Sequence, residues 1–326
     1  MTNTLEIKNL TVILEGRDKA PLKIIDRLNL SLAPGEILGL VGESGSGKSM
    51  TALSVMGLLP PGVRISQGEI FFKGRNLTAL TPEKLRSLRG LDIGMVFQEP
   101  MTALNPVFTV GRQVAEVYTA HLGLSKKQAW QEAVTMLGKA GMPDPARRAG
   151  HYPHQLSGGM RQRVLIAMAM ALNPALLLAD EPTTALDVTI QAQILALLGQ
   201  LVQEEKSACL LITHNLAVVA QMAQRVAVMY AGRLVEVAAI EQMFSAPLHP
   251  YTQGLWACLP AQARAGEKLP VIAGTVPSLG EVPPAACSFA PRCPQALDLC
   301  RQAEPALLNL NGDRRVACFL RHQERK

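Results

Sequence analysis

Residues 42–49 read GESGSGKS, which fits the pattern G-x-x-x-x-G-K-[ST] of a phosphate-binding loop. A short apolar run at 36–41 comes before this loop, and a stretch of helical composition at 48–56 follows it. Glycines let the backbone curl so that successive N–H groups point at phosphate oxygens, while Lys48 adds a positive charge and Ser49 can ligate Mg²⁺. Strand, loop and helix in this order predict a nucleotide site.

Short apolar runs that end in polar residues occur again at 176–179 and 208–213, with a helical stretch at 189–204 between them. Strands that alternate with helices predict a parallel sheet and an α/β fold. Segments 5–14 and 28–32 alternate apolar and polar residues and predict further strands.

The segment at about 100–171 shows helical periodicity with little strand signal, and we interpret it as a helical insertion in the sheet domain. The composition changes after Leu259, where prolines accumulate and four of the six cysteines follow. A length of 326 residues suggests about two domains. We therefore expect an α/β domain over 1–258 and a small irregular domain over 259–326.

Charge and composition exclude several classes of protein. Lys and Arg exceed Asp and Glu by 32 − 26 = 6, but they form no basic runs, and aromatic residues are only 4% of the chain. A nucleic-acid partner is therefore not expected. The N-terminus MTNTLEIKNL lacks a secretory signal, and the apolar stretch 164–172 falls short of the roughly 20 residues that a membrane span requires. We expect a cytoplasmic chain.

Two further motifs bear on nucleotide chemistry. The run LLLADE at 176–181 ends in Asp180, placed to hold Mg²⁺ through water, and in Glu181, which can polarise the water that attacks the γ-phosphate. The run LSGGMRQR at 156–163 opens a helix and forms a second potential anion site. Because the chain has only one such pair of carboxylates, this second helix start is expected to serve a nucleotide held mainly by another chain.

In this order, the motifs resemble those of ATP-binding cassette (ABC) ATPases over about the first 250 residues. Residues 42–49 resemble the Walker A loop, 176–180 resemble Walker B, and 156–162 resemble the LSGGQ signature with Met160 in place of glutamine. Residues 184–187 resemble the D-loop. The resemblance implies a P-loop NTPase fold, in which a RecA-like core carries antiparallel β and helical subdomains.

The resemblance also implies roles for single residues. Gln98 corresponds to the Q-loop glutamine and His214 to the switch histidine, although Asn215 stands where the family pattern has aspartate. By this resemblance the catalytic residues are Glu181, His214 and Gln98, and the Mg²⁺ ligands are Ser49, Gln98 and Asp180. The implied ATP contacts are Gly42, Ser44, Gly45, Ser46, Gly47, Lys48, Ser49, Met50, Gln98, Asp180, Ser157, Gly158 and Gly159.

The four C-terminal cysteines are Cys287, Cys293, Cys300 and Cys318. Four thiolates in a loop-rich segment can hold zinc or an iron–sulfur cluster, form two disulfides, or remain structural thiols. A cytoplasmic ATPase disfavours disulfides, and the close C-x₂₋₄-C pairs of zinc sites are missing, so the spacing favours a larger iron–sulfur cluster. Cys209 and Cys258 are expected to be buried apolar side chains.

The runs HPYT at 249–252, GTVP at 274–277 and PRCP at 291–294 resemble the C-terminal extension of oligopeptide and dipeptide importer ATPases. That group also serves uptake of nickel and metallophores. The resemblance implies an ATP-hydrolysing subunit of a bacterial importer for peptides, nickel or metal chelates. It also implies ATP and Mg²⁺ as cofactors and a [4Fe–4S] cluster on the four cysteines.

Family resemblance implies the partners too. A second, homologous but distinct ABC ATPase subunit is expected to close head to tail with this chain, beneath two membrane-spanning permease subunits that receive cargo from a substrate-binding protein. The chain is then peripheral on the cytoplasmic face of the bacterial inner membrane. The alternatives are a soluble ABC ATPase without a transport role and an iron–sulfur redox or sensor protein.

Overall fold

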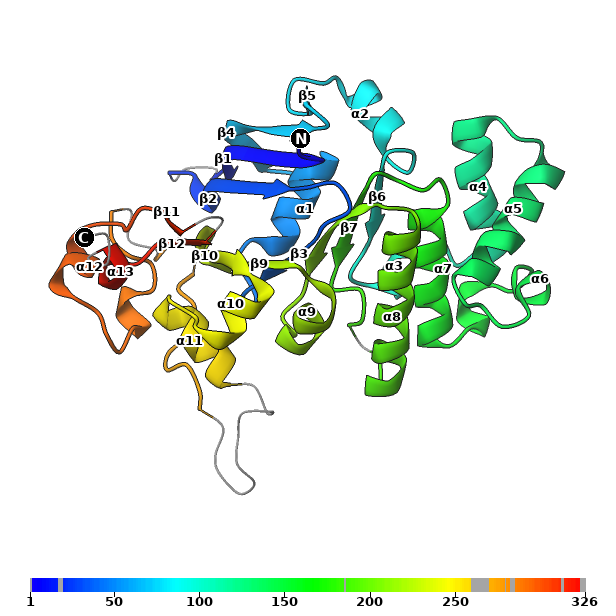
Figure 1. Ribbon diagram of the computed structural model, residues 1–326. Helices are drawn as coiled ribbons and strands as arrows, with labels where there is room; N and C mark the ends of the chain where they lie inside the picture. Colours follow the sequence, from blue (N-terminus) through cyan, green and yellow to red (C-terminus); the bar gives the residue numbers. More distant parts are fainter. Residues whose placement is uncertain are drawn as a thin grey trace. The chain divides into compact units, whose positions relative to one another are not determined.

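The computed structural model describes residues 2–16, 20–184, 186–258, 270–278, 280–281, 285–311 and 314–322. The chain forms two compact units, each built from several segments (Figure 1). The first unit comprises Met1–Leu5, Leu32–Ile37 and Phe71–Ile212, and the second comprises Glu6–Ser31, Leu38–Ile70 and Thr213–Lys326. The predicted change of domain after Leu259 lies outside the described residues.

Parallel strands form the centre of the first unit. Strand β7 (Leu176–Asp180) lies between β6 (Ile93–Val96) and β8 (Ala208–Ile212), and it pairs in parallel with both. Every residue of the three strands is buried, as expected for parallel strands that are covered on both faces. The predicted strands at 176–179 and 208–213 are confirmed, whereas β6 is an addition to the predicted elements.

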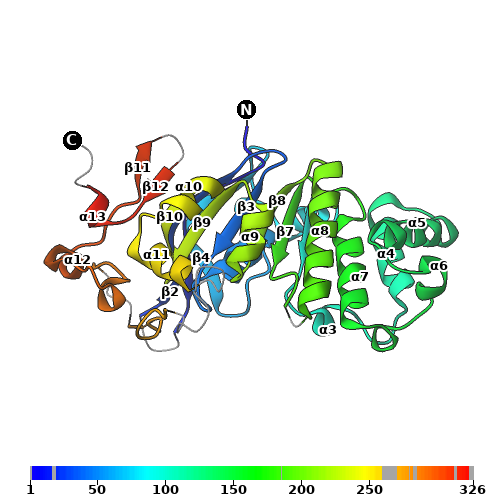
Figure 2. The same ribbon diagram turned by 60° about the horizontal axis from the view of Figure 1, so that its bottom comes forward.

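Helices make up most of the predicted insertion. They are α3 (Pro100–Ala103), α4 (Val110–Leu122), α5 (Lys126–Lys139), α6 (Pro145–Arg148) and α7 (Gly158–Met170). Figure 2 shows α7 between the group α4, α5 and α6 on one side and α8 (Val188–Glu204) on the other, and α7 contacts α4, α5, α8 and β6. The first unit also contains α2 (Pro82–Leu88) and β5 (Arg75–Asn76), which pairs antiparallel with the end of β4 (Val63–Phe72).

In the second unit, β3 (Ile37–Val41) leads through the loop 42–47 into α1 (Lys48–Met56). Strand β9 (Arg225–Tyr230) pairs in parallel with β3 and in antiparallel with β10 (Arg233–Ala239). The turn between β9 and β10 is Ala231-Gly232, where both residues have positive φ, as in the two-residue turns that suit β-hairpins.

The C-terminal part of the chain extends the same sheet. Strand β12 (Arg314–Val316) pairs antiparallel with β10, and β11 (Leu308–Asn311) pairs antiparallel with β12. These strands escaped the sequence-based prediction because three or four residues are too few to show an alternating pattern. The short helices α12 (Asp298–Gln302) and α13 (Phe319–His322) complete this part.

The second unit also contains a separate sheet, in which β1 (Leu5–Leu14) lies between β2 (Leu22–Leu32) and β4 (Val63–Phe72). Its remaining helices are α9 (Leu216–Met222), α10 (Ile240–Ser245) and α11 (Pro250–Ala257). Among the described residues, no helix combines the length and the apolar character needed to pass through a membrane.

Close packing in the first unit yields a stability prediction. A Cβ atom at Gly94 in β6 would lie 2.3 Å from the backbone oxygen of Ala169 in α7, so Gly94→Ala must push the helix and strand apart. We expect this change to lower the free energy of unfolding by about 1–3 kcal/mol, as overpacking does. Chemical denaturation followed by circular dichroism measures the effect.

The matched control is Gly138→Ala in α5, where the nearest atom outside the helix backbone would lie at an ordinary 3.6 Å from the new Cβ. We expect this variant to be as stable as the parent chain or slightly more stable, because alanine favours the helix. Equal stability of Gly94→Ala and the parent chain would contradict the packing argument.

Candidate nucleotide site

The phosphate loop of the second unit rests on the end of β9. A Cβ atom at Gly42 would lie 2.1 Å from the carbonyl oxygen of Met229, so only glycine allows this approach. Gly47 is the N-cap of α1 with φ 101°, and a Cβ atom there would meet the Met229 side chain at 2.8 Å. The N–H of Gly232 donates to the carbonyl oxygen of Ser46 at 3.0 Å. The loop therefore has a fixed backbone against which a phosphate can bind.

Lys48 lies inside the curve of this loop and is almost fully buried. Its Nζ donates to the carbonyl oxygens of Gly42 at 2.8 Å and Glu43 at 2.9 Å, and to the Ser46 hydroxyl at 3.3 Å. A lysine ammonium in this position can donate charge-assisted hydrogen bonds to phosphate oxygens. Around it, Ser44 and Gly45 are exposed at the tip of the loop, and Ser49 and Met50 are half-buried in the first turn of α1.

The first unit holds the predicted carboxylates. Asp180 ends β7 and is 5% exposed, and Glu181 follows with φ 45°, a left-handed conformation that is uncommon for a residue with a side chain. The Glu181 N–H donates to the carbonyl oxygen of Ile212 at 2.8 Å, which fixes the backbone there. The positive φ at Glu181 ends the extended conformation of the strand.

Two side chains donate to the same carboxylate oxygen of Glu181. Gln98 Nε2 lies 3.2 Å from Glu181 Oε2, and the Thr184 hydroxyl lies 2.8 Å from that atom. The structure thus brings Gln98 and Glu181 together, as the sequence-based hypothesis requires. Thr184 was predicted only as the first residue of the D-loop, so its hydrogen bond to Glu181 is an addition to the predicted site. Ala185 of the predicted D-loop lies outside the described residues.

The second predicted anion site lies at the start of α7, also in the first unit. Ser157 is the N-cap of α7, and its hydroxyl accepts from the N–H of Met160 at 3.3 Å. Ser157 and Gly158 are exposed, so the N–H groups of the first turn face the surface. A Cβ atom at Gly159 would lie 2.7 Å from the Ile190 side chain, which explains why glycine stands there.

His214 belongs to the second unit, where it is exposed directly before α9. Its neighbour Asn215 is the N-cap of α9, and its side-chain oxygen accepts from the N–H of Ala217 at 3.0 Å. Asparagine and aspartate are equally good N-caps, so the departure from the family's His-Asp pair preserves the helix start and changes only the charge beside His214. The phosphate loop and His214 thus lie in the second unit, and Gln98, Asp180, Glu181 and Ser157 lie in the first.

All four predicted cysteine ligands lie around one small cavity in the second unit. The cavity is about 10 Å³ in volume, and its lining also includes apolar residues such as Phe319 and Leu320 and the polar residues His249 and Gln295. Burial above all, with the neighbouring Cys300 and Cys318 thiols adding to it, raises the pKa of Cys287 to about 11. Burial likewise raises the pKa of Cys293 and of Cys318. These three thiols keep their protons unless a bound cation favours the thiolate form.

The arrangement of the thiols differs from that around a single ion. Within the parts of the chain that the structure describes, no three His, Cys, Asp or Glu side chains are placed to hold one metal ion.

Cys209 is fully buried in β8, as predicted, and burial raises its pKa to about 12. The prediction of a buried Cys258 is wrong, because this residue is half-exposed at the end of α11 and its thiol donates to the carbonyl oxygen of Pro270 at 3.0 Å.

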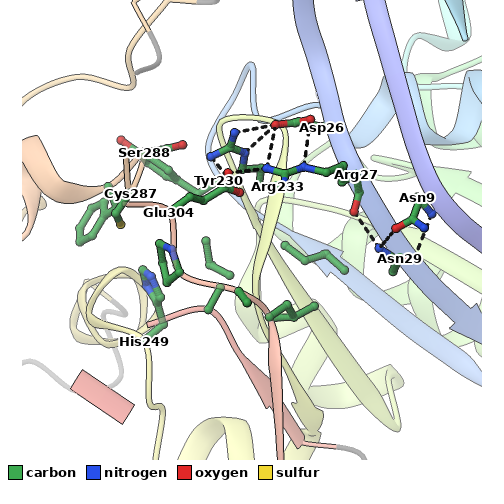
Figure 3. Close-up of a pocket in the computed structure, with 17 residues that line it drawn as sticks. Asn9, Asp26, Arg27, Asn29, Tyr230, Arg233, His249, Cys287, Ser288 and Glu304 are labelled. Atoms are coloured by element: carbon green, nitrogen blue, oxygen red, sulfur yellow. Dashed lines mark hydrogen bonds and ion pairs between the residues drawn. The ribbon is translucent and has the colours of Figure 1, made fainter. Parts of the chain in front are cut away.

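A cavity of about 280 Å³ lies beside the cysteines in the second unit (Figure 3). Arg233 pairs with Asp26 and with Glu304, and Arg27 also pairs with both carboxylates. Although burial opposes ionisation, the hydrogen bonds from Arg233 and Lys23 outweigh it and hold the pKa of Asp26 below its usual value. The two arginines and the two carboxylates balance in charge. Because Asp26 and Arg27 lie in β2, Arg233 lies in β10 and Glu304 lies in the C-terminal segment, their ion pairs join these three parts of the chain.

Comparisons with known proteins agree with these observations. Residues 25–184 match the family model described as ABC transporter, and residues 235–300 match the model described as oligopeptide/dipeptide transporter, C-terminal region. The oligopeptide transport ATP-binding protein AppD of Bacillus subtilis (strain 168) is 47% identical to this chain, and the match covers 99% of this chain and 98% of AppD. The dipeptide transport ATP-binding protein DppD of Escherichia coli (strain K12) is 48% identical, over 93% of this chain and 92% of DppD.

Solved structures show the same fold. The ATP-binding cassette MJ0796, as a dimer in a post-hydrolysis state with ADP and Pi, has a TM-score of 0.66 and 29% identity, over 72% of this chain and 98% of its own. The cbiO1 structure from Clostridium perfringens has a TM-score of 0.63 and 24% identity, over 76% of this chain and 92% of its own, and supports the fold alone. The P-loop NTPase fold predicted from the motifs is confirmed. The chain belongs to the ABC transporter family of ATPases and carries the C-terminal region of the oligopeptide/dipeptide transporters.

Proposed function

We propose that this chain is the ATP-hydrolysing subunit of a bacterial importer for peptides. The observation that carries the proposal is the carboxylate of Glu181, which Gln98 and Thr184 hold in a chain that also has a complete phosphate loop. The relatives AppD and DppD, named for oligopeptide and dipeptide transport, support peptides as the cargo. Nickel or a metal chelate is the alternative cargo.

In the proposed mechanism, the loop residues 42–49 and Lys48 bind the β- and γ-phosphates of ATP, and Met50 follows in the first turn of α1. Ser49, Gln98 and Asp180 would hold Mg²⁺, which would neutralise charge on the phosphates. Glu181 accepts a proton from the water that attacks the γ-phosphate. His214 stabilises the γ-phosphate as the reaction proceeds.

We also propose that two ATPase subunits close head to tail on ATP. Ser157 and Gly158 are exposed at the start of α7, where they can meet a nucleotide held by the other chain. The dimeric structure of MJ0796 with ADP and Pi supports this arrangement. The second subunit is a similar but distinct ATPase in this proposal, and the segment 99–106 links Gln98 to two permease subunits that receive cargo from a binding protein. The chain then lies peripherally on the cytoplasmic face of the inner membrane.

The change Glu181→Gln tests the catalytic assignment. Because the amide cannot accept the proton of the attacking water, we expect hydrolysis to fall by at least about 100-fold while ATP still binds. ATP hydrolysis by the transporter with its membrane subunits, together with equilibrium binding of labelled ATP, measures both effects.

Glu132→Gln on the exposed face of α5 is the matched control and should hydrolyse ATP at the parent rate. Near-normal turnover of Glu181→Gln would refute the role of Glu181.

If wild-type transporter takes up labelled nickel or a metal chelate but no peptide, the peptide assignment is refuted and the alternative cargo is supported.

We further propose that residues 259–326 form an extension whose cysteines hold a [4Fe–4S] cluster. The four thiols line one cavity, and four cysteine thiolates are the usual ligands of such a cluster, which supports the proposal. Cys287, Cys293, Cys300 and Cys318 would ligate the cluster as thiolates, and the positive charge of the irons would favour loss of the thiol protons.

Anaerobic purification tests the cluster. We expect the wild-type chain to contain iron and inorganic sulfide in equal amounts and to absorb visible light, and we expect Cys300→Ser to lose both signals. Cys258→Ser should retain them, because Cys258 lies outside the shared cavity. Stoichiometric zinc without visible absorbance would contradict the proposal.

A further inference from the structure

An ion pair joins the cysteine segment to the phosphate loop. Arg292, which immediately precedes Cys293, places Nη1 at 3.1 Å from each carboxylate oxygen of Glu43, the second residue of the loop. The Arg292 side chain is only 7% exposed and that of Glu43 is 29% exposed. This contact spans nearly 250 positions of sequence, and both residues belong to the second unit.

The guanidinium of Arg292 is fixed on its other sides as well. Its Nε donates to the carbonyl oxygen of Ala273 at 2.9 Å, and Nη2 donates to that of Ile272 at 3.4 Å. Nη1 also lies 3.4 Å from the Tyr230 hydroxyl. Burial opposes the charge, but the hydrogen bonds with Tyr230 and Glu43 outweigh it and raise the pKa of Arg292 above its usual value. A lysine ammonium cannot reach all of these partners at once.

The backbone of Glu43 is held from a second side. Its N–H donates to the hydroxyl of Tyr251 in α11 at 2.9 Å. The Tyr251 ring packs against Tyr230 at 4.7 Å between ring centres and against Phe289 of the cysteine segment at 5.3 Å. Aromatic contacts of this kind fix ring positions, so the Tyr251 hydroxyl has a defined place beneath the loop.

These contacts bear directly on Lys48. The carbonyl oxygens of Gly42 and Glu43 both accept hydrogen bonds from Lys48 Nζ, and Glu43 is the residue that Arg292 and Tyr251 hold. A buried ion pair adds little stability of its own, because desolvation offsets the attraction. The position of the Arg292–Glu43 ion pair beside the phosphate loop is better explained by a role in fixing the geometry of that loop.

We propose that Arg292 and Tyr251 are positioning residues that hold the phosphate loop, through Glu43, in the shape that binds ATP. The C-terminal cysteine segment thereby contributes to the nucleotide site without touching the nucleotide. This inference rests on the proposed ATP site at residues 42–49 and Lys48.

The test uses the full-length chain in its transporter complex and compares the KM for ATP with kcat. We expect Arg292→Met to raise KM about 10-fold with a much smaller change in kcat, because a displaced loop weakens ATP binding before it affects the attacking water. Arg292→Lys should restore part of the affinity, since it keeps the charge near Glu43. Tyr251→Phe should also raise KM, because it leaves the N–H of Glu43 without its acceptor.

A double variant distinguishes positioning from general weakening of the fold. Glu43→Gln and Arg292→Met act on one contact, so we expect the double variant to have nearly the KM of Arg292→Met alone. Arg301→Met is the matched control, because Arg301 is exposed and follows Cys300 in the same segment, and its KM should stay at the parent value. Thermal denaturation of each variant verifies folding.

Unchanged KM in folded Arg292→Met and Tyr251→Phe would overturn the inference, as would additive effects in the double variant or an equal rise in Arg301→Met. If Arg292→Met does not fold, Arg292→Lys and Tyr251→Phe still decide the question in the same way. Failure of the proposed ATP site itself has a different signature, because Lys48→Ala would then bind ATP as tightly as the parent chain.

Discussion

The approach of the phosphate loop to β9 is the contact on which the second unit depends. With no room for a Cβ atom at Gly42, the loop lies directly on the carbonyl oxygen of Met229. The turn after β9 then reaches the loop through the N–H of Gly232. One residue past Met229, Tyr230 carries the aromatic contacts to Tyr251 and Phe289. The end of a single strand thus fixes the loop, the hairpin and the start of the C-terminal segment.

In the first unit, a strained residue has the corresponding part. Glu181 adopts positive φ at the end of β7, where its N–H is tied to Ile212 of the neighbouring strand. Strain of this kind costs free energy and persists where the surroundings hold the residue firmly. The hydrogen bonds from Gln98 and Thr184 then orient the carboxylate. The parallel strands supply the rigid base, and the loops at their carboxyl ends supply the chemistry.

Local patterns predicted the elements around the site well. The helix 48–56 and the strand 5–14 have the predicted bounds, because a glycine-rich loop and an alternating pattern mark their ends clearly. Helix α7 begins at Gly158 with Ser157 as its N-cap, within the run 156–163 that was predicted to open a helix. Strand β6 was missed because four apolar residues show no periodicity.

Contacts between distant parts of the chain were beyond such reasoning. Neither the pairing of β12 with β10 nor the contact of Arg292 with Glu43 has a local signature. The PRCP run carries a family resemblance, and nothing in its sequence marks Arg292 as the partner of Glu43. The burial of Cys258 was predicted wrongly for a similar reason. Cys258 follows the end of α11, and residues 270–273, which lie near the end of this helix in space, are distant from any local pattern.

The Arg292–Glu43 contact also bears on how modular this chain is. The C-terminal extension contacts the second residue of the phosphate loop, so it is not an independent appendage. Removal of the extension would take the Arg292 guanidinium away from the Glu43 carboxylate. The phosphate loop and the C-terminal segment therefore belong to one compact unit, although nearly 250 positions of sequence separate Glu43 from Arg292.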